Sequence, residues 1–271
     1  MMLQNLHMHT TFSDGKNTAE EMVLRALAQG CTSLGFSDHS PLPWGTDNWA
    51  TPAERMEEYR QEILMLKEKY AGKMDIFLGL EMDLDSNAFD GPWDYLIGSV
   101  HSVWSNGIYR SVDYSGAVTA ETIRDYFCGD PYAYTGAYFQ QVAAVAEKTK
   151  CQIIGHFDLV TKFNQQTPLF DETDPRYLTA ALNALDELSK HDVIFEINTG
   201  AMSRGYRTDP YPSPTLLKAM RERNCRICIT SDSHSVDTIF HAFDQAKELA
   251  KSCGYQESWV LTKHGFIPQE I

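Results

Sequence analysis

The stretch DIFLGLE at residues 75–81 is a short apolar run that ends in a carboxylate. Its hydrophobic residues follow one another without the polar alternation of a half-exposed strand, so we expect a strand that is covered on both faces. Similar short runs recur along the chain, each separated from the next by a longer segment. The seven expected strands cover residues 3–7, 33–37, 75–81, 95–100, 152–156, 193–198 and 226–230.

The segments between these strands carry helix signals. Thr18 precedes Glu20 and Glu21, and Gly30 closes the same segment, which is typical of a helix start and stop. Strands that alternate with helices form parallel sheets with right-handed crossovers, so the sequence predicts an α/β barrel or a closed, distorted relative of one. The expected helices cover residues 18–29, 51–70, 137–148, 174–190, 213–223 and 236–252.

The length of 271 residues fits a single α/β barrel domain spanning residues 1–271. One region, at about residues 102–136, contains several glycines and many aromatic residues and reads as a loop or helical insertion. A connection of this length is usually functional or a lid.

The charge balance excludes some partners. Lys and Arg total 23 against 37 Asp and Glu, which gives a net charge of −14. A nucleic-acid surface needs a basic field, so we expect no nucleic-acid partner, and an anionic membrane face is disfavoured for the same reason. There is no apolar run of membrane-spanning length and no signal-peptide pattern at the start, so the cytoplasm is the expected compartment.

Each expected strand ends in polar side chains of the kind that bind metals. The carboxyl ends of parallel strands are where active sites gather in α/β folds, so these side chains should meet. Six of the nine histidines lie at such positions, whereas His191, His241 and His264 do not and should face solvent or cap helices. The candidate ligands are His7, His9, Asp14, His39, Glu81, His101, His156, Asp232 and His234.

The donor set indicates the type of metal. Imidazole and carboxylate without thiolate suit Zn, Mn or Fe. Nine ligands are more than one ion can use, so two or three divalent ions are expected, with Glu81 as a bridging carboxylate. Centres of this kind lower the pKa of a bridging water and clamp phosphoryl oxygens.

These motifs together resemble the PHP family, named for its polymerase and histidinol phosphatase members. The resemblance runs from His7 to His234. The motifs that carry it are His7-x-His9 with Asp14, Asp38-His39, Gly79-x-Glu81, Gly98-Ser99-Val100-His101, Gly155-His156-Phe157-Asp158 and Ser231-Asp232-x-His234.

Membership of this family implies a distorted (βα)7 barrel, similar to a TIM barrel, with a trinuclear metal site at the carboxyl ends of the strands. It also implies that a metal-bridging hydroxide attacks phosphorus, with His7, His9, Glu81, His101, Asp232 and His234 as catalytic residues. The implied ligand sets are His7, His9, Glu81 and Asp232 for one ion, Glu81, His101 and His156 for a second, and Asp14, His39 and His234 for a third.

The length and the insertion after His101 resemble the stand-alone histidinol-phosphate phosphatases of the family. This resemblance implies hydrolysis of L-histidinol phosphate, a step of histidine biosynthesis. The alternatives are a phosphoesterase for another small phosphoester, such as a nucleotide, and a metal-binding module without catalysis. The oligomeric state and the native metals are left open by the sequence.

A phosphate monoester is anionic, so cationic side chains should assist the metals. Arg204 and Arg207 follow the sixth strand and Lys162 follows the fifth, which makes all three candidates for substrate binding. Arg204 is the first choice, because its loop can reach over the metal centre and the resemblance places a phosphate-binding arginine there. Candidates for contacts with the amine and imidazole of histidinol phosphate are Asp83, Asp158, Trp104, Tyr109, Tyr132 and Tyr134. For the four aromatic residues, packing within a lid is the alternative.

Asp38 and the cysteines have interpretations other than direct binding of metal or substrate. Asp38 is a candidate for orienting His39 or a neighbouring ligand, a common arrangement around metal-bound imidazole. Cys225 and Cys228 form a C-x-x-C pair, for which a redox site or a zinc half-site is the alternative, but no second pair accompanies it and the segment reads as a buried strand, so we expect a structural role. The six cysteines are scattered through a chain of ordinary core-forming composition, so no disulfide framework is expected.

Overall fold

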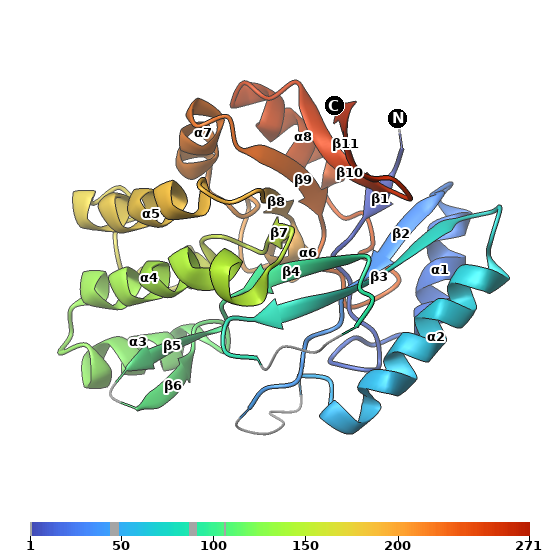
Figure 1. Cartoon of the computed structure of the whole chain (residues 1–271). Helices are drawn as coiled ribbons and strands as arrows, with labels where there is room; N and C mark the ends of the chain where they lie inside the picture. Colours follow the sequence, from blue (N-terminus) through green and yellow to red (C-terminus); the bar gives the residue numbers. More distant parts are fainter. Residues whose placement is uncertain (1, 44–48, 87–90, 106) are drawn as a thin grey trace.

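The computed structural model describes residues 2–43, 49–86, 91–105 and 107–271. Seven parallel strands form a nearly closed barrel in the order β1–β2–β3–β4–β7–β8–β9, which confirms the predicted α/β barrel (Figure 1). The strands are β1 (Gln4–Asn5), β2 (Ser33–Phe36), β3 (Asp75–Asp83), β4 (Tyr95–Ser99), β7 (Ile153–Ile154), β8 (Ile194–Asn198) and β9 (Arg226–Thr230).

The seam between the first and last strands explains why the barrel is distorted. It is closed by an isolated parallel bridge between Met8 and Ser233, in which the His9 N–H donates to the Ser233 carbonyl at 2.9 Å. Toward the amino end of the seam, side-chain hydrogen bonds replace the backbone ladder between the first and last strands. The Asn5 amide donates to the Ser231 hydroxyl at 2.8 Å and accepts from the Ser231 N–H at 3.2 Å. Strand β1 pairs with β2 at Gln4 and Asn5, so it is shorter than the expected residues 3–7.

The outer helices lie close to the predicted segments. Thr18 caps α1 in a reciprocal pair with Glu21, as the sequence pattern indicates. The predicted start of the last helix, at residue 236, is wrong, because the chain turns through Ala242 at positive φ before α8 begins at Phe243. The helices are α1 (Ala19–Ala28), α2 (Met56–Lys69), α4 (Pro131–Thr149), α5 (Pro175–Leu188), α6 (Gly200–Ser203), α7 (Pro214–Glu222) and α8 (Phe243–Ser252), with short 3-10 turns at Ala53–Arg55 and Leu159–Thr161.

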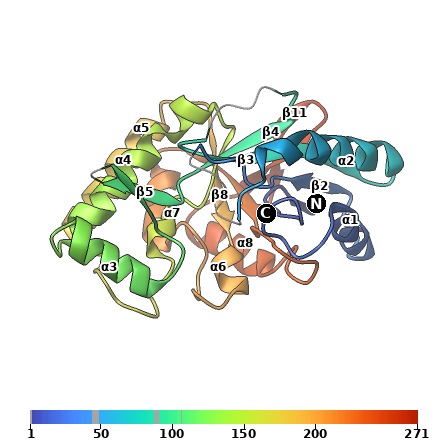
Figure 2. The same ribbon diagram turned by 90° about the horizontal axis from the view of Figure 1, so that it is seen from below.

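The insertion is more regular than a long loop. Strands β5 (Ser102–Ser105) and β6 (Ile108–Ser111) form an antiparallel pair, and α3 (Gly116–Tyr126) follows. Asp130 caps α4 and Pro131 occupies its first turn, so this helix starts before residue 137, where the sequence interpretation placed it. Figures 1 and 2 show β5 and α3 beside α4, on the side of the barrel away from α1 and α2.

A hairpin that the sequence interpretation missed closes the amino end of the barrel. It consists of β10 (Glu257–Thr262) and β11 (Gly265–Glu270). The Gln4 side chain donates to the Leu261 carbonyl at 2.8 Å and accepts from the Leu261 N–H at 2.7 Å. Leu261 packs into an apolar cluster with Phe77, Tyr95 and other strand residues.

Tyr95 fills the middle of the barrel. Its hydroxyl donates to the carbonyls of Leu6 and Phe36, and its ring lies against Gly79. A Cβ atom on Gly79 would lie only 2.3 Å from that ring, so glycine is required here by close approach. The space above Tyr95, toward the carboxyl ends of the strands, is left to polar side chains. None of the described helices is both long and apolar enough to cross a bilayer.

Candidate metal centre and active site

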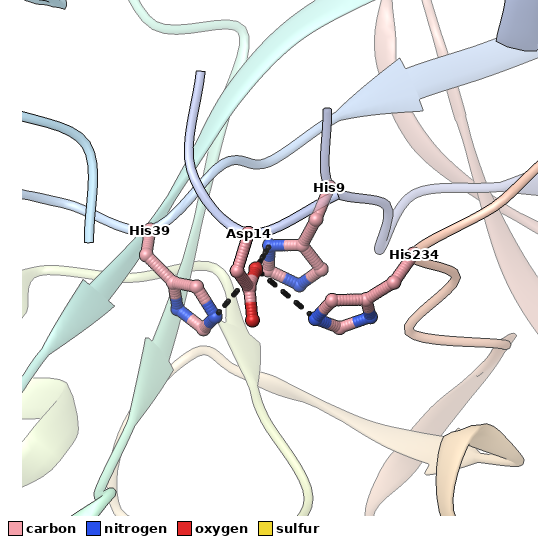
Figure 3. Close-up of side chains that lie close together, drawn as sticks. All are labelled: His9, Asp14, His39 and His234. Atoms are coloured by element: carbon pink, nitrogen blue, oxygen red, sulfur yellow. Dashed lines mark ion pairs between the residues drawn. The ribbon is translucent and has the colours of Figure 1, made fainter. Parts of the chain in front are cut away.

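The structure brings all nine predicted ligands together at the carboxyl end of the barrel. The donor atoms of eight of them form three overlapping groups, and within each group the atoms lie within 4.8 Å of one another. The ninth, His156, lies beside these groups, with Nε2 3.1 Å from Glu81 Oε1. In the group drawn in Figure 3, Asp14 Oδ1 faces three imidazoles, at 3.2 Å from His234 Nε2, 3.8 Å from His39 Nε2 and 4.0 Å from His9 Nδ1. The groups are His9, Asp14, His39 and His234; His7, His9 and Asp232; and His39, Glu81 and His101.

Glu81 lies at the centre of the arrangement. Its Oε2 atom is 2.8 Å from His39 Nδ1 and 3.2 Å from His7 Nε2. Its Oε1 atom is 3.1 Å from His156 Nε2 and 3.4 Å from His101 Nε2, and it also accepts from the Ser99 hydroxyl at 2.6 Å. The two oxygens thus face different imidazoles, which is the geometry expected of a bridging carboxylate.

Asp232 joins the opposite side of the centre. Its Oδ1 atom lies 3.1 Å from His9 Nε2 and 3.8 Å from His7 Nε2. Its backbone has a positive φ of 47°, a conformation that non-glycine residues seldom adopt. Strain of this kind clusters at functional sites and is consistent with the side chain being aimed at a particular point.

The residues present fit a cluster of metal ions. Buried polar atoms in proteins almost always have a hydrogen-bond partner. Among the described residues, several buried atoms that converge on this centre face each other at short distance in geometry that forms no hydrogen bond. These atoms are His7 Nε2, both ring nitrogens of His9, His39 Nδ1 and Glu81 Oε2.

The electrostatics of the group favour the metal-binding forms of its carboxylates. Burial raises the pKa of Glu81, but His7, His39 and His101 outweigh burial and hold it well below its usual value. Burial likewise raises the pKa of Asp232, and Arg204 and His7 more than reverse the effect. Burial, together with His39 and His234, lowers the pKa of His9 to about 3. Both carboxylates are therefore ionised and His9 is neutral at neutral pH, as coordination requires.

Three carboxylates lie behind the candidate ligands. Asp83 Oδ2 accepts from His101 Nδ1 at 3.0 Å, so this side chain orients the candidate ligand His101. The sequence had suggested a contact between Asp83 and the substrate. Asp38 accepts from the backbone and hydroxyl groups of Thr10 and Ser13, which fixes the loop between His9 and Asp14.

Glu196 is the third of them, and its Oε2 atom lies 2.8 Å from His7 Nδ1 in a fully buried position. The sequence analysis did not single it out as a site residue. The available signal was a charged residue between the apolar residues of the strand IFEIN at residues 194–198.

A cavity of about 1030 Å³ opens over the centre and is lined by cationic side chains as well as by six of the candidate ligands. Arg204 lies in its wall and donates to Asp232 Oδ2 at 2.9 Å and to the Asp232 carbonyl at 3.2 Å. Lys162 also lines it, with Nζ 3.5 Å from Asp113 Oδ2. Lys16 is a third cation in the wall, and the sequence analysis missed it because no motif marks it.

Arg207, the third predicted substrate cation, lies in a different place. It is buried outside the residues that line the cavity, where it donates to Thr161 and to Asp209 Oδ2 at 2.9 Å. Asp158, offered to the substrate amine, is also fully buried and accepts from the Ser213 N–H at 2.9 Å. These contacts favour a structural role for both side chains, and substrate binding by Arg207 stays a prediction.

The aromatic wall of the cavity comes from other residues than the sequence suggested. Trp104 and Tyr109 are exposed, Tyr134 is fully buried, and Tyr132 packs under Arg176 at 3.8 Å. None of these four is among the described residues that line the cavity, which agrees with the alternative that they pack within the insertion and α4. The aromatic residues in the cavity wall are Trp49, Tyr114 and Tyr206.

The remaining histidines and the cysteines agree with their structural interpretations. His191, His241 and His264 are exposed and lie outside the centre. All six cysteines are free, and Cys228 is buried in β9 as expected for a strand residue.

Comparisons with known proteins identify the family. The PHP domain model matches residues 5–200. The chain belongs to the PHP domain family. A protein of Deinococcus radiodurans named "Probable histidinol-phosphatase" is 30% identical to it over 256 residues, covering 90% of this chain and 91% of the relative. The "Histidinol-phosphatase" of Bacillus subtilis is 28% identical over 267 residues, covering 90% of this PHP chain and 98% of the relative.

Solved structures support the fold of this PHP chain. The crystal structure of histidinol phosphate phosphatase from Lactococcus lactis, complexed with Zn, L-histidinol and phosphate, has a TM-score of 0.74 and 21% sequence identity. The alignment covers 97% of this chain and 98% of that one. Similarity over nearly both full lengths shows that the two chains share the fold.

Proposed function

We propose that this chain is a metal-dependent phosphomonoesterase that hydrolyses L-histidinol phosphate to L-histidinol and phosphate. The observation that carries the proposal is a set of buried imidazole and carboxylate atoms that, among the described residues, form no hydrogen bond and that converge beneath a cavity lined by cationic side chains. The names of the relatives supply the substrate, since several of them are histidinol-phosphatases that match most of this chain.

The candidate ligands and Arg204 would have different roles in this reaction. The nine candidate ligands would hold two or three divalent ions, with Glu81 shared between them. Bound divalent ions supply Lewis-acid stabilisation of phosphoryl oxygens and lower the pKa of water. Arg204, fixed on Asp232, would present its remaining N–H groups to the phosphate from the cavity wall. Hydrolysis breaks the ester P–O bond, transfers the phosphoryl group to water and returns a proton to the alcohol oxygen.

The size and walls of the cavity suit a small substrate. Lys16 and Lys162 add positive charge at the wall, although the chain as a whole carries a net charge of −14. A small anion that enters the cavity meets these cations, whereas an extended nucleic acid would meet the acidic exterior. We further propose that residues 1–271 act as one catalytic domain in the cytoplasm, where the six free thiols would stay reduced.

The test is phosphate release by purified protein that has been stripped with a chelator and then given Zn²⁺ or Mn²⁺. We expect L-histidinol phosphate to be hydrolysed with a much higher kcat/KM than nucleotide or sugar monophosphates, and we expect no activity before metal is restored. Equal rates for all monoesters would replace the substrate assignment with a general phosphomonoesterase. Metal binding without hydrolysis of any of them would indicate a non-catalytic metal-binding protein.

A further inference from the structure

Glu196 is a buried carboxylate with four hydrogen-bond donors on four parts of the barrel. Its Oε2 atom contacts His7 Nδ1 at 2.8 Å and accepts from the Thr230 hydroxyl at 2.8 Å. Its Oε1 atom accepts from the His156 N–H at 2.5 Å and from the Asn198 amide at 2.8 Å. The side chain therefore ties two candidate ligands, which follow β1 and β7, to strands β8 and β9.

The protonation pattern around Glu196 fixes which nitrogen of His7 can face the centre. An ionised carboxylate only accepts hydrogen bonds, so His7 must carry its proton on Nδ1. The other ring nitrogen, Nε2, points at the centre, where it lies 3.2 Å from Glu81 Oε2. A ligating nitrogen must be free of hydrogen, so a metal ion bound at Nε2 leaves the His7 ring in its Nδ1–H tautomer. This is the tautomer that a metal ligand needs.

We propose that Glu196 is a positioning residue that holds His7 in the metal-ligating tautomer and sets its position relative to His156. The proposal rests on the metal centre of the proposed function, but it concerns a residue outside the candidate ligand set. Glu196 does not line the cavity and so would affect the centre only through the two histidines it contacts.

The same hydrogen bonds predict what an isosteric amide at this position would do. The two donors on Oε1 are N–H groups that cannot become acceptors, so the amide oxygen introduced by E196Q would stay on that side. The NH₂ group of the new amide would then face His7 Nδ1, while the Thr230 hydroxyl could rotate and accept. His7 could satisfy that NH₂ only by moving its proton to Nε2, the nitrogen that should coordinate.

The decisive experiment compares E196Q with Thr230→Val in the full-length protein. Zn²⁺ affinity would be measured by competition with a chromophoric chelator, and the melting temperature would be measured without metal. We expect E196Q to bind Zn²⁺ about 10–100-fold more weakly while melting close to the wild type. Thr230→Val removes a hydrogen bond to the same oxygen without affecting the tautomer, so we expect a lower melting temperature and nearly unchanged Zn²⁺ affinity.

The opposite pattern would overturn the proposal. Either wild-type affinity in E196Q or an equal loss of affinity in Thr230→Val would mean that Glu196 has a general packing role. If E196Q does not fold, Glu196→Asp replaces it. The shorter side chain of Asp holds its carboxylate farther from His7, so this variant should bind Zn²⁺ more weakly than Thr230→Val does. A wild-type protein that binds no Zn²⁺ would instead refute the metal centre of the proposed function.

Discussion

The two ends of the barrel are built from the same strands but bury different chemistry. At the amino end, Phe77 of β3 and Ile194 of β8 belong to an apolar cluster that Leu261 of the hairpin closes. Toward the carboxyl end, at even spacing along the same strands, Glu81 and Glu196 are equally buried. Because side chains alternate along a strand, these residues all point into the barrel interior.

The contrast shows that the two ends have different tasks. Burying apolar side chains stabilises the fold, whereas burying charged groups is costly unless partners satisfy them. At the carboxyl end, in the part of the chain that the structure describes, several buried ligand atoms face one another without forming hydrogen bonds, so this end gives up stability to keep these atoms available for metal ions. Substitutions at one end should therefore change activity, and substitutions at the other should change stability.

The largest expected effect is at the carboxyl end. Asp232→Ala and His101→Ala each remove a candidate ligand, and we expect kcat/KM for L-histidinol phosphate to fall by more than about 100-fold, since even supporting residues behind metal ligands can cost that much. Circular dichroism should show a folded protein in both cases. Asp186→Ala is the matched control, because Asp186 pairs with Arg223 on the exterior. Substantial activity in both variants would remove the multi-metal mechanism.

At the amino end we expect substitutions to lower the stability with little effect on activity. Ile153 is fully buried in the apolar cluster, so Ile153→Ala should lower the free energy of unfolding by about 2–5 kcal/mol through lost contacts and a cavity. The value of kcat at a temperature where the variant is folded should stay close to that of the wild type. Urea denaturation and steady-state kinetics test this, and a large fall in kcat with unchanged stability would contradict the division between the two ends.

A substitution in the cavity wall should reduce activity less than the removal of a candidate ligand. Arg204→Lys keeps the charge but loses the planar fork that contacts Asp232, so we expect kcat/KM to fall about tenfold. Arg223→Lys makes the same exchange in an exterior ion pair and should leave the kinetics unchanged. If Arg204→Lys matched the wild type, the guanidinium group of Arg204 would not be required for phosphate binding.

The smallest effect concerns the insertion. Burial raises the pKa of Asp113, but Lys162 and His101 outweigh it and lower the pKa to about 2. The folded pKa lies below the unfolded value of about 3.9, so the stabilisation is present above about pH 4 and is lost as the pH falls toward about 2. The difference in unfolding free energy between wild type and Asp113→Asn should be at most about 1 kcal/mol and should vanish over that range. A difference that stays constant down to about pH 2 would show that the carboxylate charge is not responsible.

The candidate metal centre was predictable because its ligands are local to the strands. His7, Glu81 and Asp232 each lie within a few residues of a short apolar run, and the carboxyl ends of parallel strands must meet once the barrel closes. The cap of α1 was predictable for the same reason, since Thr18 and Glu21 are only three residues apart.

What only the tertiary structure decided depends on contacts between distant segments. Glu196 meets His7 across 189 residues, and the closing hairpin reaches Gln4 across 257 residues. Arg204 and Arg207 are equivalent in the sequence, yet one lines the cavity and the other is buried beside Thr161. The sequence by itself determined the chemistry at each strand end, because periodicity and spacing are local. Which side chains support, line or close the centre depended on how the strands and loops packed against one another.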